Sequence, residues 1–180
     1  MDFITGLPKS EGKSVIMVVV DRLTKYAHFF ALSHPFKAST VSTAFMERIQ
    51  KLHGNPKIIV SDRDPIFIGN FWTELFSCLG TQLAHSSSYH PQSDGQTAIV
   101  NKCLKGYLRC FASDKQTQWL KWLPFIEWWY NTSFHTATKM TPFMALYGYQ
   151  PPSITSYLRE NSKVLAVEHH IKHQQHVVQL

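Results

Sequence analysis

Cysteine is scarce in this 180-residue sequence, and its pattern argues against two common uses. Cys78, Cys103 and Cys110 are odd in number and form no CxxC pair. A disulfide framework or a zinc knuckle is therefore not expected. We expect the protein to reside in a reducing compartment. Long apolar runs are absent too, because residues 16–20 are far too few to cross a bilayer. The first residues lack the charged and apolar regions of a signal peptide, so we expect no membrane association.

The composition is that of one globular domain with a basic surface. Apolar residues make up 44% of the chain and charged residues only 17%, a balance that favours a packed core over disorder. A chain of 180 residues is long enough for one such core. The formal net charge is +6. This excess of positive charge favours a polyanionic partner, nucleic acid first.

The pattern of apolar residues predicts short strands early in the chain and helices later. β-rich runs lie at residues 1–4, 14–21, 26–32, 57–61 and 82–86. The first three follow one another closely, as in a hairpin or meander. Helical patterns occupy about residues 39–52, 70–79, 96–111, 118–132 and 141–148.

The helix starts and the buried faces can also be predicted. Ser39 or Thr40 can cap the first helix, and Gly54 can end it. Apolar spacing predicts the buried positions of the first two helices, namely Val41, Phe45, Ile49 and Leu52, then Phe71, Leu75 and Leu79. Asp21, which follows a strand, is expected to serve the turn.

An antiparallel meander followed by alternating helices and strands indicates an α/β fold with a mixed five-stranded sheet flanked by helices. This is the element order of the ribonuclease-H-like fold. We expect the first strand to be truncated, because only its tail is present at residues 1–4. Residues 1–150 are predicted to form the core, because Pro151 and Pro152 end the compact part. Residues 151–180 are predicted to be a linker and the start of a truncated C-terminal helix.

Two acids stand where strands would deliver them to a common cleft. Asp62 ends a short apolar run, and Asp2 lies in the first strand. Phosphoryl transfer with two Mg²⁺ ions about 4 Å apart requires a bridging carboxylate and others that hold each ion from outside. A helix-borne acid would complete the set, but position 98 is Ala98. From these residues alone, an ordinary strand-to-turn boundary at Asp62 is the favoured interpretation.

Five segments together resemble the integrase core of gypsy-type long-terminal-repeat retrotransposons. They are residues 1–4 (MDFI), 18–26 (VVVDRLTKY), 59–67 (IVSDRDPIF), 89–97 (YHPQSDGQT) and 140–148 (MTPFMALYG). The resemblance implies a ribonuclease-H-like fold, DNA strand transfer in the nucleus with Mg²⁺ or Mn²⁺, and dimeric cores. It also implies a triad of acids with 35 residues between the last two, which falls here on Asp2, Asp62 and Ala98. The spacing of 35 residues between the last two triad positions is present in this sequence, but the last position is alanine instead of an acid.

The helix that carries Ala98 has a basic face. Ala98, Lys102 and Lys105 share one side at i, i+4 and i+7. By itself this pattern is as consistent with a solvated basic face as with a binding site, but the resemblance favours DNA contact. The predicted DNA-binding residues are Gln96, Asn101, Lys102, Lys105 and Arg109.

A polar segment before this helix resembles the mobile loop over an integrase active site. Its glycine, serine and aspartate content supports flexibility independently of the resemblance. The predicted loop residues are Tyr89, His90, Pro91, Gln92, Ser93, Asp94 and Gly95.

Two other acids could in principle replace the missing one. Asp94 lies four positions before Ala98, but Gly95 makes an early helix start unfavourable. Asp64 precedes Pro65 in a predicted turn and is expected to point elsewhere. We therefore predict no replacement by either residue.

Other residue clusters have ordinary structural explanations. The tryptophans Trp119, Trp122, Trp128 and Trp129 could stack on bases, but their helical spacing favours a place in the core. His169, His173 and His176 have a chelating spacing without a supporting acid, so a solvated helix end is expected. Cys103 and Cys110 are seven positions apart and are expected on one helix face.

Two functions remain open at this stage. The first is an integrase core that is catalytically inactive because of Ala98. The second is a non-catalytic nucleic-acid-binding or assembly module of the same fold, which could associate with itself. A nuclease acting on RNA–DNA hybrids is a weaker third hypothesis, which the segment 89–97 disfavours.

Overall fold

A computed structural model describes residues 1–85, 91–111, 116–152, 164–168 and 171, without the side chains of residues 91–96 and 111. The helix-like pattern of residues 164–180 falls mostly outside these ranges, as do His169, His173 and His176. Within the described ranges, no helix is long and apolar enough to cross a membrane.

The first three strands form an antiparallel sheet. They are β1 (Asp2–Ile4), β2 (Val15–Val20) and β3 (Ala27–Leu32), in the order β1-β2-β3. The register pairs Asp2 with Val18 and Val15 with Leu32. Runs of β-branched and aromatic residues favour this extended pairing. The predicted meander is therefore confirmed.

The remaining two strands form a parallel pair. They are β4 (Ile58–Ser61) and β5 (Gln82–His85), with Val60 opposite Ala84. The amino group of Met1 donates a hydrogen bond of 2.6 Å to the Val60 carbonyl, so β1 and β4 meet at this point. All five predicted strands are present, but their ladders join them as three and two rather than as one continuous sheet.

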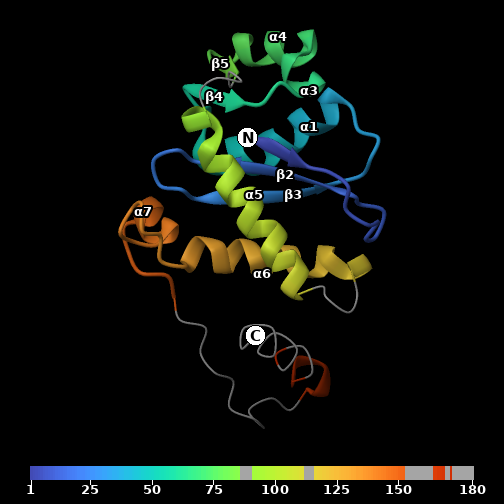
Figure 1. Cartoon of the computed structure of the whole chain (residues 1–180), viewed down its shortest axis with the longest axis vertical. Coiled ribbons are helices and arrows are strands. Elements are labelled where there is room, and N and C mark those ends of the chain that lie inside the picture. Colours follow the sequence, from blue (N-terminus) through green and yellow to red (C-terminus); the bar gives the residue numbers. More distant parts are fainter. Residues whose placement is uncertain (86–90, 112–115, 153–163, 169–170, 172–180) are drawn as a thin grey trace.

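Helices cover the strands on both faces (Figure 1). α5 (Pro91–Phe111) crosses the strands, and α6 (Trp119–Thr132) runs along β3. α1 (Ala38–Phe45) and α4 (Asn70–Cys78) pack against each other. The shorter helical segments are η1 (Met46–Gln50), α2 (Lys51–His53), α3 (Pro65–Ile68), η2 (Gln116–Gln118) and α7 (Pro142–Tyr147).

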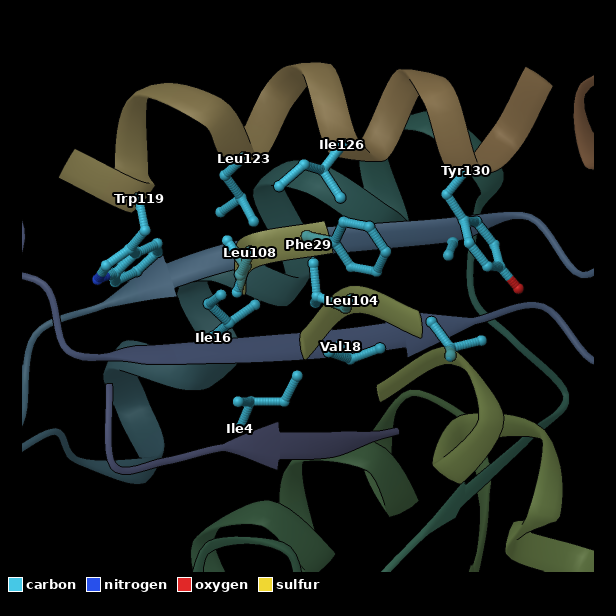
Figure 2. Packing of buried hydrophobic residues seen from close by; sticks show 12 residues of the cluster. Ile4, Ile16, Val18, Phe29, Leu104, Leu108, Trp119, Leu123, Ile126 and Tyr130 are labelled. Atoms are coloured by element: carbon cyan, nitrogen blue, oxygen red, sulfur yellow. The ribbon is translucent and has the colours of Figure 1, made fainter. Parts of the chain in front are cut away.

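The core on the α5 and α6 face is apolar and closely packed (Figure 2). Alternate residues of each strand point to this face because successive side chains of a strand point to opposite sides. The buried cluster contains Ile4, Ile16, Val18, Ala27, Phe29, Val100, Leu104, Leu108, Trp119, Leu123, Ile126 and Tyr130. The expectation that the tryptophans belong to the core is confirmed for Trp119 but wrong for Trp129, which is 45% exposed.

The core on the other face joins both groups of strands. It contains Met1, Val15, Met17, Phe30, Leu32, Val41, Phe45, Ile49, Ile59, Phe67, Trp72 and Phe76. Because Met1 and Ile59 lie in the same cluster as β2 and β3 side chains, this layer holds β4 beside the three-stranded sheet. The shared layer is consistent with the predicted α/β fold.

The first predicted helix differs from expectation at both ends. Its N-cap is Lys37, without a side-chain hydrogen bond, so the predicted cap at Ser39 or Thr40 is wrong. Leu52 is 62% exposed, although it was expected to be buried. The π-helical segment η1 explains this, because its wider turn shifts the phase of the residues that follow. Gly54 ends the helix with φ of +76°, as predicted.

The second predicted helix buries a different stripe. Trp72 and Phe76 are buried, whereas Phe71 is 50% exposed. The predicted stripe of Phe71, Leu75 and Leu79 is thus wrong for Phe71, while Leu75 and Leu79 are partly buried. Trp72 packs between Phe67 and Phe76, with ring centroids 5.3 and 4.5 Å away. The larger ring takes the buried position because it covers more apolar area.

Two polar side chains of α6 cover the outer edge of β3. The Asn131 amide accepts a hydrogen bond from the Ala27 N–H and donates one to the Ala27 carbonyl, both at 2.8 Å. Glu127 accepts one from the Phe29 N–H at 2.7 Å. An edge strand otherwise exposes unpaired backbone groups, so these side chains replace a neighbouring strand.

We predict that Asn131→Ala lowers the free energy of unfolding by about 3 kcal/mol, because it leaves both buried backbone groups of Ala27 unpaired. Urea unfolding measures this change. The exposed Asn55→Ala variant is the control and should change stability by less than about 0.5 kcal/mol. A loss below about 1 kcal/mol in Asn131→Ala would show that the amide does not hold β3.

Candidate functional site

The junction of β1 and β4 brings two acids together. Asp2 opens β1, and Asp62 follows the last residue of β4. The Met1–Val60 hydrogen bond aligns these strands, so the two partly buried carboxyl groups face each other within hydrogen-bonding reach. The structure thus brings Asp2 and Asp62 together, while their role as metal ligands stays a prediction.

The electrostatics of the pair favour a cation. Burial is the larger cause and the neighbouring Asp2 carboxylate the next, and together they raise the pKa of Asp62 to about 6. Two like charges in a partly buried position disfavour each other's ionisation. A divalent cation between them would remove this penalty, because hard cations prefer carboxylate oxygens.

The backbone around Asp62 fixes its direction. An oxygen of Asp62 accepts a hydrogen bond of 3.3 Å from the Asp64 N–H. The carboxylate of Asp64 instead caps α3 and accepts a bond of 2.9 Å from the Ile66 N–H. Asp64 therefore serves the helix start, in agreement with the prediction that it does not replace the missing acid.

The helix beside the pair supplies an amide rather than an acid. Ala98 is exposed on α5. One turn later, Asn101 donates a short hydrogen bond from its Nδ2 to Asp2. The second oxygen of Asp2 accepts a bond of 2.7 Å from the Phe3 N–H. Asn101 Oδ1 is buried without a hydrogen-bond partner. The sequence indicated Asn101 only as a DNA contact; its position one turn after Ala98 was the available signal for this second role.

The faces of α5 separate apolar and basic residues. Val100, Leu104 and Leu108 are buried, whereas Lys102, Lys105 and Arg109 are exposed. The basic side chains therefore project from the sheet on the same helix that carries Ala98. The side chain of Gln96 lies outside the described residues. DNA contact by these residues stays a prediction.

The predicted active-site loop is largely helical. Tyr89 and His90 lie outside the described residues, but Pro91, Gln92, Ser93, Asp94 and Gly95 form the start of α5. The prediction of a loop is therefore wrong for these five residues. Proline is favoured in the first helical turn, where its missing N–H costs nothing, and this outweighs the penalty of about 1 kcal/mol for Gly95.

The early helix start also affects the argument about Asp94. Its backbone lies in α5, one turn before Ala98, so the objection based on Gly95 is wrong. Its side chain lies outside the described part, and replacement of the acid by Asp94 is not tested.

The donors present suit one hard cation. Across the described side chains, no group of three or more histidine, cysteine, aspartate or glutamate residues is arranged to hold a metal ion. Asp2 and Asp62 provide two carboxylates, and Asn101 provides an amide oxygen nearby. Mg²⁺ commonly binds one or two carboxylates and completes its shell with water and phosphate oxygens. These residues therefore fit a single ion.

We predict that Asp62→Asn stabilises the protein at pH 7.5. The folded pKa of Asp62 lies near 6, above the usual 3.8, so the folded state binds more protons between these values and stability falls as pH rises. Removing the charge should recover about 1 kcal/mol at pH 7.5, after allowance for solvent screening. Thermal unfolding at pH 7.5 and 3.5 measures the difference, which should nearly vanish at the lower pH. The exposed Glu74→Gln variant is the control, and a destabilised Asp62→Asn at pH 7.5 would contradict the prediction.

Comparisons with known proteins find similarity in sequence and in fold. No protein-family model matches the chain. The chain is 35% identical over 170 residues to the Transposon Tf2-3 polyprotein of Schizosaccharomyces pombe, a match that covers 91% of this chain and 13% of the polyprotein. The chain thus spans about an eighth of the length of the curated relatives it matches.

Solved structures share the fold. A chain of the simian T-cell lymphotropic virus intasome, in complex with PP2A regulatory subunit B56 gamma, matches with a TM-score of 0.68 at 18% identity, covering 91% of this chain and 59% of that one. The HTLV-2 integrase catalytic core domain in complex with magnesium matches with a TM-score of 0.62 at 15% identity, covering 80% and 93%. The ribonuclease-H-like fold is confirmed. The chain is therefore similar in sequence to part of a retrotransposon polyprotein and shares the fold of retroviral integrase catalytic cores.

Proposed function

We propose that this chain is a DNA-binding integrase core that has lost strand-transfer activity. The single observation that carries the proposal is the meeting of the Asp2 and Asp62 carboxyl groups beside a helix that presents Ala98. In this proposal, Asp2 and Asp62 are two of the three acids of a strand-transfer site. The third position has no ligand atom.

Asp2 and Asp62 would hold one Mg²⁺ or Mn²⁺. A bound dication would offset the repulsion between the two carboxylates, which contributes to the raised pKa of Asp62. Two ions in such a site stabilise the attacking and leaving oxygens of a phosphoryl transfer. The HTLV-2 core was solved in complex with magnesium, which supports the same ion here. Without an acid at position 98, the side chains that the structure describes include none to hold a second ion from outside.

Asn101 has a positioning role in this proposal. Its amide binds Asp2 and fixes the orientation of that carboxylate on the α5 side. An amide carries no charge, so it cannot replace the electrostatic contribution of a carboxylate to a dication. In this proposal the Asp2 carboxylate therefore keeps its orientation, while the site lacks the negative charge of a third carboxylate.

The exposed cations of α5 would bind DNA phosphates. Lys102, Lys105 and Arg109 project on the helix that borders the carboxylate pair, and the chain carries a net charge of +6. Contacts of lysine and arginine with phosphates supply affinity that is largely independent of sequence. DNA in the nucleus is the proposed partner.

The alternative function is a non-catalytic assembly module. Dimeric and trimeric forms of the HTLV-2 core have been solved, and the simian virus chain belongs to an intasome. Self-association of this chain is therefore proposed as well. It requires neither a metal ion nor an acid at position 98.

We predict that Ala98→Glu raises Mg²⁺ affinity by at least about tenfold, because it adds a third carboxylate beside Asp2. Isothermal titration with Mg²⁺ and Mn²⁺ measures binding, and joining of an oligonucleotide end to target DNA measures activity. Ala98→Gln matches the added volume without the charge. Clear Mg²⁺-dependent joining by the unaltered chain would refute its inactivity. Failure of Ala98→Glu to restore joining despite tighter ion binding would show that further changes block the reaction.

We predict that Lys102→Glu together with Lys105→Glu weakens DNA binding and reduces the salt slope by about 2, since each lost phosphate contact removes about 0.9. Fluorescence anisotropy with a labelled duplex at several salt concentrations measures both quantities. Lys37→Glu with Lys51→Glu makes the same charge change on α1 and α2, where both residues are exposed. Equal losses in the two double variants would show that only net charge matters and that α5 is not the DNA site.

A further inference from the structure

We propose that His28 and His53 form a binding site for a transition-metal ion, with Zn²⁺ as the expected occupant and the two Nε2 atoms as its ligands. His28 lies in β3, and His53 is the last residue of α2. Their Nε2 atoms are 3.0 Å apart. The ion would join the edge strand β3 to the helical segment that precedes β4. This inference does not rest on the proposed function.

The distance between the two ring nitrogens suits an ion that binds both. Two imidazole nitrogens bound to one tetrahedral Zn²⁺ at about 2.05 Å each lie about 3.3 Å apart. The observed separation of 3.0 Å therefore needs to widen by only about 0.3 Å. His53 is exposed at the end of its helix, so its side chain can make this adjustment and water can reach the ion.

A carboxylate on the other nitrogen of His28 sets the direction of its ring. Glu127 Oε1 lies 3.2 Å from His28 Nδ1, and Glu127 Oε2 accepts a hydrogen bond of 2.7 Å from the Phe29 N–H. A carboxylate can only accept, so His28 Nδ1 carries a hydrogen. A neutral His28 then has its free lone pair on Nε2, the atom that faces His53. A carboxylate bonded to the outer nitrogen is the usual support of a histidine that binds a metal ion.

Neighbouring aromatic rings hold the pair in place. The His28 ring contacts the rings of Tyr26 and Phe30, with centroids 5.1 and 6.0 Å away. Tyr26 also contacts the His53 ring, at 6.5 Å. The side chain of His28 is only 12% exposed, so packing restricts its movement. One ligand is therefore preorganised, which lowers the entropic cost of binding, and the other can adapt.

The electrostatics of His53 also suit a metal ion. Partial burial is the largest cause that lowers the pKa of His53 below its ordinary value of 6.5, and the nearby His28 is the next. Asp21 acts in the opposite direction. A lowered pKa favours the neutral imidazole, which is the form that binds a metal ion. The Asp21 carboxylate adds negative charge near the site, which a cation would also favour.

The donor atoms identify the class of ion. Imidazole nitrogen suits Zn²⁺, Cu²⁺ and Ni²⁺, whereas Mg²⁺ prefers oxygen. Within the described side chains, no third histidine, cysteine, aspartate or glutamate joins the pair in a metal-holding group, so water would complete the shell. Two imidazoles and two waters meet the tetrahedral preference of Zn²⁺. The site thus differs in its chemistry from the pair of Asp2 and Asp62.

A bound ion would stabilise the connection between the sheet and β4. His53 is followed by Gly54, and β4 begins at Ile58. An ion fixed to β3 through His28 would anchor the start of this connection. The two histidines are 25 positions apart, so folding is needed to bring them together. An ion that binds only the folded chain stabilises it by mass action.

Calorimetric titration of the whole chain with Zn²⁺, compared with the variant His53→Gln, tests the site. We expect His53→Gln to lose one binding event and to lose a zinc-dependent rise in melting temperature of about 3 °C. Zinc bound elsewhere is common to both proteins, so the difference counts only the pair. His34→Gln removes an exposed histidine outside the pair and should leave the titration unchanged. Equal titrations of the unaltered chain and His53→Gln would overturn the proposal.

The role of Glu127 has a separate test. Glu127→Gln keeps the size of the side chain and removes its charge, so it should weaken Zn²⁺ binding by at least about tenfold, as loss of a supporting carboxylate does. The same titration measures this change. Unchanged affinity would overturn the assignment of Glu127 as the residue that positions His28.

The ring tautomers distinguish metal binding from a hydrogen bond alone. In the metal-free pair, Nε2 of a neutral His28 accepts, so His53 Nε2 carries the hydrogen. Binding through both Nε2 atoms moves the hydrogen of His53 to Nδ1 and leaves that of His28 on Nδ1. NMR of the imidazole nitrogens should show this change of tautomer in His53 alone. An unchanged His53 tautomer at saturating Zn²⁺ would contradict the site. These measurements use neither DNA nor Mg²⁺, so their failure is distinct from failure of the proposed function.

Discussion

The contact between β1 and β4 is the constraint on which the site depends. It places the carboxyl groups of Asp2 and Asp62 against each other, and the bond from Met1 to Val60 links the backbones of the two strands. The apolar layer that contains Met1, Ile59 and Phe45 supports the same contact from one side. The energy that holds two like charges together therefore comes from side-chain packing more than from a continuous β-ladder, since burial of apolar area is the dominant favourable contribution to folding.

The sequence predicted those parts of the fold that depend on local pattern. Five strands and the main helices follow from the spacing of apolar residues, and the turn role of Asp21 is confirmed by its bonds to Thr24, of 2.6 and 2.8 Å. The helical pattern expected at residues 141–148 is confirmed as α7, at whose start Thr141 accepts a bond from the Met144 N–H. These features involve neighbours within a few positions, so the chain itself carries the information.

The features that the sequence did not predict depend on distant partners. The π-helical turn that exposes Leu52 and the choice of Trp72 over Phe71 are decided by the layer against which the helices pack. The pairing of Asn131 with Ala27 joins residues 104 positions apart. The bond from Asn101 to Asp2 joins residues 99 positions apart. The two acids were found because a motif marks them, whereas no motif marked the amide that binds one of them.

Alanine at position 98 has opposite consequences for the proposed chemistry and for folding. A third carboxylate near Asp2 and Asp62 would add repulsion to a pair in which the pKa of Asp62 is already raised. Alanine avoids this repulsion, and the Asn101 amide compensates part of the remaining charge by donating to Asp2. A catalytic site with three acids needs bound cations to offset its own repulsion, whereas this site has less charge to offset. Under the proposed function, alanine at position 98 would both deprive a second ion of a ligand and make the fold less dependent on the first.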